Sequence, residues 1–501
     1  MSELFEKLQV HLDKAYAYRT ALSMISWDNS TAAPKDAIEF TAKAMGILSG
    51  EYYHVIINDD VKNILQELSA EEEQQKLSAY EKAIVKQMKK EFQDLELIPP
   101  EEYQAYELVQ AKAAPIWEEA KNTNNYEMFA PALEEVITYV KKFAGYKQKE
   151  GQKLYDVLLN DYEEGFTVEI LDEFFEKLRN ALLPLVQEIR KKPDFIQRDF
   201  LHQSYDIETQ KKLSRFMAEY IGFDFNRGIM AESAHPFTMN LHNRDVRLTN
   251  HYHENKFEDA IFSVVHEGGH GLYEQDIDDE ITLTPIGGGT SMGMHESQSR
   301  FYENNIGRSR EFWVPIFDKV KEFFPEQLKN VSIEDFYHAI NYSYPRFIRT
   351  EADELTYPFH IMIRYEIEKM ILEEQVTVAE LPKIWNQKYE EYLGIVPEND
   401  TVGILQDMHW SGGMIGYFPS YALGSAIAAQ LFHHMEGVMP IRQYMEEGNM
   451  APIREFLREH IHKYGASKTS QELLLETTGE KFNPDYYIEY LTKKYTELYE
   501  L

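Results

Sequence analysis

The sequence contains no cysteine among its 501 residues. This absence excludes disulfide bonds, thiolate metal ligands and a cysteine nucleophile, and it is compatible with a reducing compartment. There is also no run of about 18 apolar residues, so we expect no membrane span and no membrane partner. Residues 1–6 lead directly into a charged amphipathic segment, without the basic and apolar regions of a secretory signal. We therefore expect a cytoplasmic protein.

Positive charge is scarce as well. The chain has 51 Lys and Arg residues against 85 Asp and Glu residues, which gives a formal net charge of −34 at pH 7. So acidic a surface repels phosphate backbones, and we expect no nucleic-acid partner. Solubility accounts for most of this charge, although an acidic field would also attract cationic substrates.

What the sequence has in abundance is helical periodicity. Apolar residues recur at spacings of three and four over 3–26, and again over 71–95 and 125–150, where Glu and Lys fill the remaining positions. With 43% hydrophobic residues the chain can build a large core. The length allows two or three domains as well as one. Because no fixed repeat, low-complexity linker or clear boundary is visible, we predict a mainly α-helical protein with a single domain over 1–501.

Residues 237–252 interrupt the helical pattern. Apolar and polar residues alternate over 237–241 and again over 246–248, on either side of a turn that contains Asn243. This pattern predicts two antiparallel strands, with an irregular loop as the alternative. A peptide substrate can add to the edge of such a small sheet as a further strand.

The segment SVVHEGGHGLYEQD, residues 263–276, carries the first chemical motif. His266 and His270 are four residues apart, so on a helix they share a face and can bind one metal ion. Glu267 lies beside them, where it can take a proton from metal-bound water. The pattern H-E-x-x-H fixes only three residues and can arise by chance. The apolar residues 260–265 favour function, because two histidines and a glutamate in a buried helix are costly without a partner.

A catalytic zinc needs a third protein ligand and one open position. Glu296 follows His270 by 26 residues, in the segment MGMHESQSRFYEN that reads as a second helix. His295 is the competing ligand, but on a helix it points about 100° away from its neighbour. We prefer Glu296 as the third ligand, because a glutamate on a second helix at about this distance resembles the arrangement of the Glu-zincins.

Three glycines in the same segment need a reason, because each costs a helix about 0.8–1 kcal/mol relative to alanine. On a helical wheel Gly268 and Gly271 flank Glu267, while Gly269 lies beside His266. Bare backbone at these positions leaves space for water and a scissile carbonyl, or it allows another helix to pack closely. Both interpretations stay open from the sequence.

Six motifs in a fixed order make the sequence resemble one family. The sequence is similar to the carboxypeptidase Taq family, also called thermostable carboxypeptidase 1. The matching motifs are His235-Pro-Phe237, Asp245-Val-Arg247-Leu-Thr249, His266-Glu-Gly-Gly-His270, His295-Glu-Ser-Gln298, Ile348-Arg349-Thr-Glu-Ala-Asp353 and Gly403-Ile-Leu-Gln406-Asp-Met-His409-Trp410.

The resemblance implies a large helical fold of two lobes around a deep substrate cleft, like those of neurolysin and angiotensin-converting enzyme. In that fold residues 1–200 would form a helical cleft wall and 230–425 would carry the active-site motifs, with the small antiparallel sheet near the active site. It also implies release of C-terminal amino acids from peptides with broad specificity. One Zn²⁺ per subunit is expected, with Co²⁺ as an alternative, and the partners are peptide substrates and a second copy in a homodimer.

The chemistry of peptide hydrolysis requires a general base and oxyanion donors, and it suggests further catalytic residues. Glu267 would act as general base and return its proton to the leaving amine. The oxyanion of a tetrahedral intermediate needs donors besides the metal, and Tyr421 is our first candidate. His409 is another donor candidate, and Tyr417 is a second tyrosine that could contact substrate, although ordinary packing is the alternative for any tyrosine among 33.

A carboxypeptidase must also hold a terminal carboxylate, which arginine does best through a planar two-pronged contact. The resemblance points to Arg349, whose alternative is an ion pair with Asp353 one helical turn later. Arg247 could support the substrate site or simply pair with Asp245. His235 is a structural histidine by default, and its motif raises it to a possible supporting role.

Two other functions remain open at this stage. An oligopeptidase or endopeptidase would use the same metal chemistry without a carboxylate anchor. A catalytically dead peptide-binding protein would keep the cleft, but it has no need for a general base, and Glu267 is intact.

Overall fold

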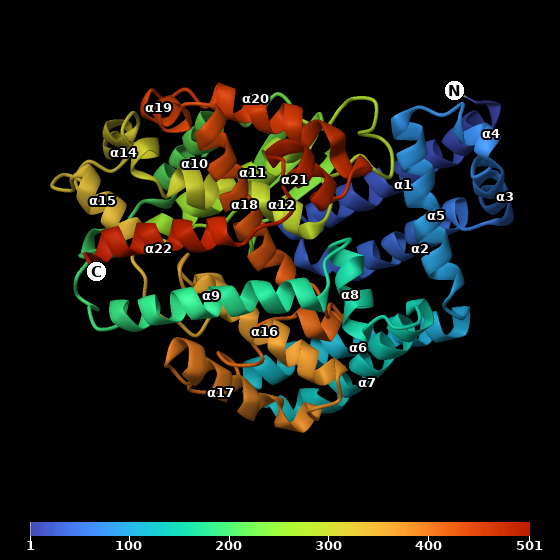
Figure 1. Cartoon of the computed structure of the whole chain (residues 1–501), viewed down its shortest axis with the longest axis horizontal. Coiled ribbons are helices and arrows are strands. Elements are labelled where there is room, and N and C mark those ends of the chain that lie inside the picture. The colour runs from blue at the N-terminus through green and yellow to red at the C-terminus, as the bar shows by residue number, and fades with distance from the viewer. Residues whose placement is uncertain (1) are drawn as a thin grey trace.

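The computed structural model describes residues 2–501 and consists of helices with one small sheet (Figure 1). Its buried apolar side chains gather into three clusters. The N-terminal core includes Leu8 and Val61, the lower core includes Leu178 and Trp385, and the upper core includes Val264 and Trp313. The expected mainly helical fold is confirmed.

The N-terminal core lies among five helices at the right of Figure 1, four of which contribute buried apolar side chains. The expected helix over 71–95 is in fact two helices, because Ser78 and Glu81 form a reciprocal cap that starts a new one. The amide of Glu81 donates to Ser78 Oγ at 3.2 Å, and the amide of Ser78 donates to Glu81 Oε2 at 2.7 Å. The five are α1 (Glu3–Thr31), α2 (Ile38–Ile56), α3 (Asp59–Leu68), α4 (Glu71–Gln74) and α5 (Ala79–Glu96).

The lower core lies between long amphipathic helices. In α9, buried Leu171, Phe174, Leu178 and Leu182 recur at spacings of three and four and so form one apolar stripe. The helices are α6 (Pro100–Thr123), α7 (Tyr126–Lys147), α8 (Leu154–Tyr162), α9 (Val168–Ile189), α16 (Tyr357–Leu372) and α17 (Leu381–Leu393), and α22 (Asp485–Tyr499) packs against α9.

The upper core holds the H-E-x-x-H helix. The bounds are α10 (Ile207–Ile221), α11 (Phe257–Gln275), α12 (Met292–Arg300), a π-helix (Phe301–Gly307), α13 (Arg310–Trp313), α14 (Phe317–Phe323), α15 (Ile333–Ile340), α18 (Pro419–Val438), α19 (Ile441–Glu446), α20 (Ala451–His460) and α21 (Ser470–Thr478). Helix α18 joins the two cores. Leu423 and Ala426 belong to the lower core, whereas Ile427 and Leu431 belong to the upper core. A helix that is apolar all round is expected in such a buried position.

The sheet confirms the predicted hairpin and corrects its surroundings. Strands β2 (Thr238–His242) and β3 (Asp245–Asn250) pair antiparallel. A third strand, β1 (Gly228–Glu232), pairs parallel to β3 on its other side, so the sheet is mixed rather than purely antiparallel. The link 233–237 makes this possible by crossing the end of β3, where the amide of Ser233 donates to Asn250 O at 3.1 Å. Apolar and polar residues do not alternate over 228–232, so the sequence pattern did not predict this strand.

The glycines of α11 serve close packing. A Cβ at Gly269 would lie 2.6 Å from the carbonyl oxygen of Gln298 and 2.7 Å from Ser299 Cα, both backbone atoms of α12. A Cβ at Gly268 would meet Ile221, and one at Gly271 would meet Phe223 and Leu248. All three positions are therefore occupied by neighbouring elements, and the alternative of free space for substrate at these glycines is wrong.

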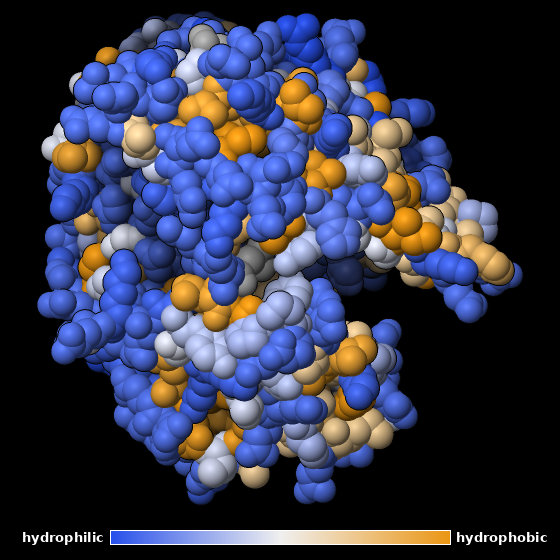
Figure 2. All heavy atoms as spheres, turned by 90° about the vertical axis from the view of Figure 1, so that its right-hand side faces the viewer, coloured by the Kyte–Doolittle hydropathy of each residue, from blue (hydrophilic) through white to orange (hydrophobic). Residues whose placement is uncertain are grey.

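A deep recess hollows one face of the molecule. Figure 2 shows this recess between an upper and a lower body, with apolar side chains on parts of its rim. The two-lobed, cleft-containing fold that the resemblance implied is therefore present. No helix within residues 2–501 is both long and apolar enough to cross a membrane.

Candidate metal centre and active site

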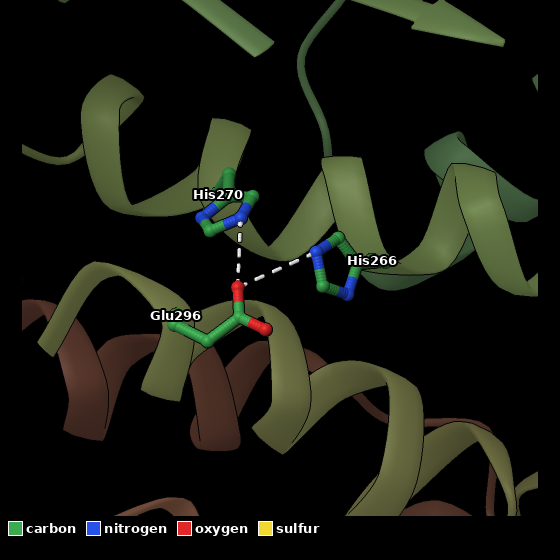
Figure 3. A group of neighbouring side chains, drawn as sticks. All are labelled: His266, His270 and Glu296. Carbon is green, nitrogen blue, oxygen red and sulfur yellow. Dashed lines mark ion pairs between the residues drawn. The ribbon is translucent and has the colours of Figure 1, made fainter. Parts of the chain in front are cut away.

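Three side chains converge where α11 packs against α12. His266 and His270 extend from one face of α11, and the Glu296 carboxylate on α12 points toward both rings (Figure 3). Glu296 Oε2 lies 3.6 Å from His266 Nε2 and 3.5 Å from His270 Nε2. Among residues 2–501 this is the group of His and carboxylate side chains whose ligand atoms lie close enough to share one ion.

These distances fit a metal ion. Ligand atoms that lie about 2.0–2.2 Å from a tetrahedral zinc are about 3.4 Å from one another. The observed separations of 3.5 and 3.6 Å are close to that value. Two imidazole nitrogens and one carboxylate oxygen are also the donors that catalytic zinc sites use. The residues present therefore fit a divalent cation.

The outer nitrogen of His266 is held by a carboxylate. His266 Nδ1 lies 2.8 Å from Glu303 Oε2, on the π-helix that continues α12. Arg300 Nη1 donates to the same oxygen at 3.1 Å, and Arg308 Nη2 donates to Glu303 Oε1 at 3.3 Å. Burial lowers the pKa of His266, but the charge of Glu296 and the bond to Glu303 outweigh burial and leave that pKa above its usual value. This arrangement fixes the ring with Nε2 toward the centre.

His270 is held by a second histidine. His270 Nδ1 lies 2.5 Å from His295 Nδ1, and His295 Nε2 lies 2.6 Å from Glu274 Oε1. If His295 Nε2–H donates to the carboxylate, its Nδ1 accepts from His270 Nδ1–H and leaves His270 Nε2 as a free lone pair. Burial and the neighbouring His295 lower the pKa of His270 to about 3. The sequence left His295 open as an alternative metal ligand. In the structure His295 contacts the outer nitrogen of His270 and is not one of the three residues whose ligand atoms converge.

Glu296 is held from two sides. Arg300 Nε donates to Glu296 Oε1 at 2.7 Å, which leaves Oε2 to face the imidazoles. Burial raises the pKa of Glu296, but Arg300 and His266 outweigh it and keep that pKa well below its usual range. Helix α18 approaches closely here, because a Cβ at Gly424 would lie 2.5 Å from Glu296 Cγ.

The Glu267 carboxylate is oriented by the sheet. Thr238 Oγ1, on β2, donates to Glu267 Oε2 at 2.6 Å. Burial raises the pKa of Glu267 above its usual value, and the charge of His266 and the bond to Thr238 only partly oppose this effect. A carboxylate with a raised pKa is suited to accept and return a proton.

Tyr421, Tyr417 and His409 form one aromatic group. His409 Nε2 lies 3.2 Å from the hydroxyl of Tyr421, and the rings of Tyr417 and Tyr421 are 5.2 Å apart edge to face. Tyr421 lies one turn before Gly424 on α18, which brings this group toward Glu296. Burial lowers the pKa of His409 to about 4, so this imidazole is neutral at pH 7.

Arg349 is buried and paired with Asp407. Its Nε and Nη2 donate to Asp407 Oδ1 at 3.0 and 2.9 Å, and its guanidinium lies over the ring of Tyr421 at 4.7 Å. The alternative ion pair with Asp353 is wrong. Asp353 accepts from the amides of Leu355 and Thr356 instead, and Arg349 lies in a 3₁₀ turn at Arg349–Glu351 rather than in an α-helix.

The remaining two candidates lie on the sheet and its link. Arg247 pairs with Asp245 through contacts of 2.9 and 2.8 Å, along the same strand, and its guanidinium lies over Trp27 of α1 at 5.6 Å. His235 is exposed, and its carbonyl oxygen accepts from Ser233 Oγ at 2.6 Å. The structure thus connects Arg247 to the N-terminal helices and leaves the side chain of His235 in solvent.

Comparison with known proteins agrees with this geometry. The sequence model of a family described as "Carboxypeptidase Taq (M32) metallopeptidase" matches residues 7–495. The chain belongs to this family. It is 43% identical over 485 residues to carboxypeptidase 1 of Bacillus subtilis, covering 97% of this chain and 96% of that protein. It is 35% identical to thermostable carboxypeptidase 1 of Pyrococcus furiosus, covering 99% of each. The crystal structure of an M32 carboxypeptidase from Deinococcus radiodurans R1 matches all of both chains, with a TM-score of 0.96 and 32% identity.

As a member of the carboxypeptidase Taq family, the protein is a metal-dependent carboxypeptidase. The sequence did not reveal Thr238, Glu303 or Glu274 as supports of its active site. Glu274 lies four residues after His270 and Glu303 seven after Glu296, so helical spacing offered a signal for both. Thr238 offered none, because its contact with Glu267 spans 29 residues and depends on how β2 packs on α11.

Proposed function

We propose that His266, His270 and Glu296 hold one divalent cation, with zinc as the natural ion and cobalt as a functional substitute. The preference for zinc follows from two imidazoles and one carboxylate with the spacing of a tetrahedral site. When bound there, the cation would polarise the scissile carbonyl and acidify a water molecule. The observation that carries this proposal is the convergence of the three ligand atoms.

Glu267 serves as the general base and then as the general acid. Thr238 Oγ1 holds Oε2 of this carboxylate at 2.6 Å, so the other oxygen is the one that accepts the proton of the attacking water. Burial raises the pKa of Glu267, which favours return of the proton to the leaving amine.

Tyr421 and His409 stabilise the oxyanion of the tetrahedral intermediate. Both side chains are neutral donors, since burial raises the pKa of Tyr421 and lowers that of His409. In the free enzyme they bond to one another at 3.2 Å, and substrate would redirect either hydrogen toward the carbonyl oxygen. Tyr417 packs against the same group and contacts substrate beside it.

Arg349 binds the terminal carboxylate of the peptide. Asp407 occupies the edge of the guanidinium formed by Nε and Nη2. The edge between the two terminal nitrogens has one long contact, from Nη1 to the Tyr357 hydroxyl at 3.3 Å, and can receive a second carboxylate end-on. Arg247 and His235 support the peptide from the sheet side.

The protein acts as one catalytic unit over residues 1–501 with broad side-chain specificity. Homodimer formation and a cytoplasmic location stay predictions that accompany this proposal.

Two measurements test the function. A set of peptides with free C termini should be shortened one residue at a time, whereas their C-terminally amidated forms should resist, because Arg349 then faces no carboxylate. Glu267→Gln should lose roughly 10²–10⁴-fold in kcat and keep its bound metal. Equal cleavage of free and amidated peptides would contradict the role of Arg349, and an active Glu267→Gln enzyme would contradict that of Glu267.

A further inference from the structure

Glu368 is a fully buried carboxylate that neither the sequence motifs nor the proposed mechanism uses. It lies on α16 with 0% of its surface exposed. Three groups donate to it: the Tyr155 hydroxyl at 2.6 Å, the Trp410 indole Nε1 at 2.7 Å and the Gly416 amide at 2.9 Å. No cation is hydrogen-bonded to it, so burying this charge costs free energy that a neutral side chain would not cost.

Two of these donors lie at the two ends of one segment, residues 410–416. Trp410 follows His409 directly, and Gly416 precedes Tyr417 directly. Each end of the segment is therefore joined to the same carboxylate, one through Oε1 and the other through Oε2. His409 and Tyr417 are the adjoining residues of the proposed active site.

The segment needs such a support. It contains Gly412, Gly413 and Gly416, and the last two have φ values of +72° and +94°. A chain with these glycines has a large conformational freedom to lose. A Cβ at Gly416 would also lie 3.1 Å from the backbone carbonyl of Leu158, so only glycine allows the Gly416 amide to reach Glu368 this close to α8.

We propose that Glu368 is a positioning residue. By hydrogen bonding to both ends of the 410–416 segment, it fixes the positions of the hydrogen-bond donors His409, Tyr417 and Tyr421. The inference rests on the proposed function, because it assigns Glu368 an effect on turnover through those donors. Glu368 itself touches neither substrate nor the metal ligands.

A carboxylate is required here, and an amide cannot replace it. All three partners present hydrogens, and only the Tyr155 hydroxyl could turn to accept one. In Glu368→Gln the amide nitrogen therefore faces either the Trp410 indole or the Gly416 amide, and that end of the segment is released. Burial raises the pKa of Glu368 to about 7, and the hydrogen bonds from Tyr155, Trp410 and Gly416 oppose this rise because they stabilise the charged form.

The test compares two substitutions of one hydrogen-bonded group. Glu368→Gln should lower kcat about 10-fold or more, because small misplacements of catalytic groups are costly, while KM stays within about twofold. Tyr155→Phe is the matched control, since it removes a bond to the same carboxylate but no bond to the segment, and its kcat should stay within about twofold. Metal content should be unchanged in both.

Trp410→Phe provides the second line of evidence, also if Glu368→Gln fails to fold. It should lower kcat as Glu368→Gln does, and the double variant should be no worse than the poorer single variant, because both release the same tether. Wild-type kcat in folded Glu368→Gln, or equal losses in Glu368→Gln and Tyr155→Phe, would overturn the positioning role. If the wild-type enzyme itself fails to shorten free peptides, the proposed function fails instead, and the two failures are distinguishable.

Discussion

The two imidazoles of the candidate metal site are held by different kinds of partner. His266 bonds to the carboxylate of Glu303, which is itself paired with Arg300. His270 bonds to His295, and His295 in turn bonds to the carboxylate of Glu274. The first arrangement raises the proton affinity of its ring and the second lowers it. Both leave Nε2 toward Glu296, so the ring orientations are set before any ion binds.

Glu368 gives a prediction at the same scale. Its pKa is about 7 in the folded protein against 4.5 as its ordinary value. Because the folded pKa is raised, the stability from the protonated group is fully present below pH 4.5 and is lost as the pH rises through about 7. About 2.5 pKa units correspond to about 3 kcal/mol. The groups that interact with this carboxylate are Tyr155 and Tyr162 on α8, Trp410 and Gly416 at the two ends of the 410–416 segment, and Arg364 on its own helix.

Urea unfolding of wild type and Glu368→Gln at pH 5, 6, 7 and 8 measures this effect. Between pH 5 and pH 8 the free energy of unfolding of the wild type should fall by about 2–3 kcal/mol relative to that of the variant. Other titrating groups cancel in the difference. A difference that stays constant with pH would contradict the assigned pKa. If the prediction holds, Glu368→Gln turns over more slowly than the wild type, yet its stability relative to the wild type increases as the pH rises. Loss of a structural hydrogen bond alone would not produce this combination.

At the scale of elements, the contact between α11 and α12 sets the geometry of the candidate metal site. The backbone of α12 lies against Gly269, so the two helices are closer than any side chain there would allow. This spacing sets the distance from the imidazoles on α11 to the carboxylate on α12. Gly269, one of the glycines that weaken α11 as an isolated helix, therefore allows α11 to lie close enough to α12 for His266, His270 and Glu296 to converge.

Gly269→Ala tests this relation. Its Cβ would meet Gln298 O at 2.6 Å and Ser299 Cα at 2.7 Å, and backbone atoms can give way only by moving the helix. We expect a loss of about 1–3 kcal/mol in unfolding free energy together with weaker metal binding. Gly145→Ala in α7 is the control, because no atom lies within 4 Å of its Cβ, and it should gain up to about 1 kcal/mol. Normal zinc affinity in Gly269→Ala, measured by competition with a chelator, would argue against the role of helix spacing.

At the scale of the whole molecule, the proposed metal site joins two consecutive helices to the rest of the upper core. The residues that would hold the ion lie on α11, which packs on the sheet, and on α12, which packs on α18, and α18 contributes to both the upper and the lower core. An ion held by these residues binds the folded state and not an unfolded chain, so it should stabilise the whole upper core by mass action.

Zinc at 1,000 times its Kd should therefore raise the free energy of unfolding by about 4 kcal/mol relative to chelator-treated protein. The measurement is urea unfolding with zinc and with chelator. Glu296→Gln serves as the control, because it removes a ligand charge and should abolish most of the difference. A zinc effect that is equal in wild type and Glu296→Gln would place the stabilising ion elsewhere.

Much of the fold could be predicted because its signals are local. Helical periodicity predicted α1 and α7, and alternation predicted the β2–β3 hairpin. The two errors came from features with weak local signals. The cap at Ser78 divides α4 from α5, and β1 joins the sheet through a link that crosses the end of β3. In the site, helical spacing paired His266 with His270, since residues four apart share a helix face whatever surrounds them. Glu296, the third residue of the group that converges, was predicted because Glu-zincins place a glutamate on a second helix at about this distance.

The sequence by itself determined the residue types and spacings of the metal group, the acidic and cysteine-free composition, and the motifs that identify the family. Only the tertiary structure decided why α11 carries three glycines, that Arg349 pairs with Asp407 rather than Asp353, and that Glu303, Glu274 and Thr238 bond to His266, His295 and Glu267. The physical reason is that a helix fixes the relation of residues three and four apart. The partners of a buried charge or a bare backbone come from other elements, and no local periodicity encodes which ones they are.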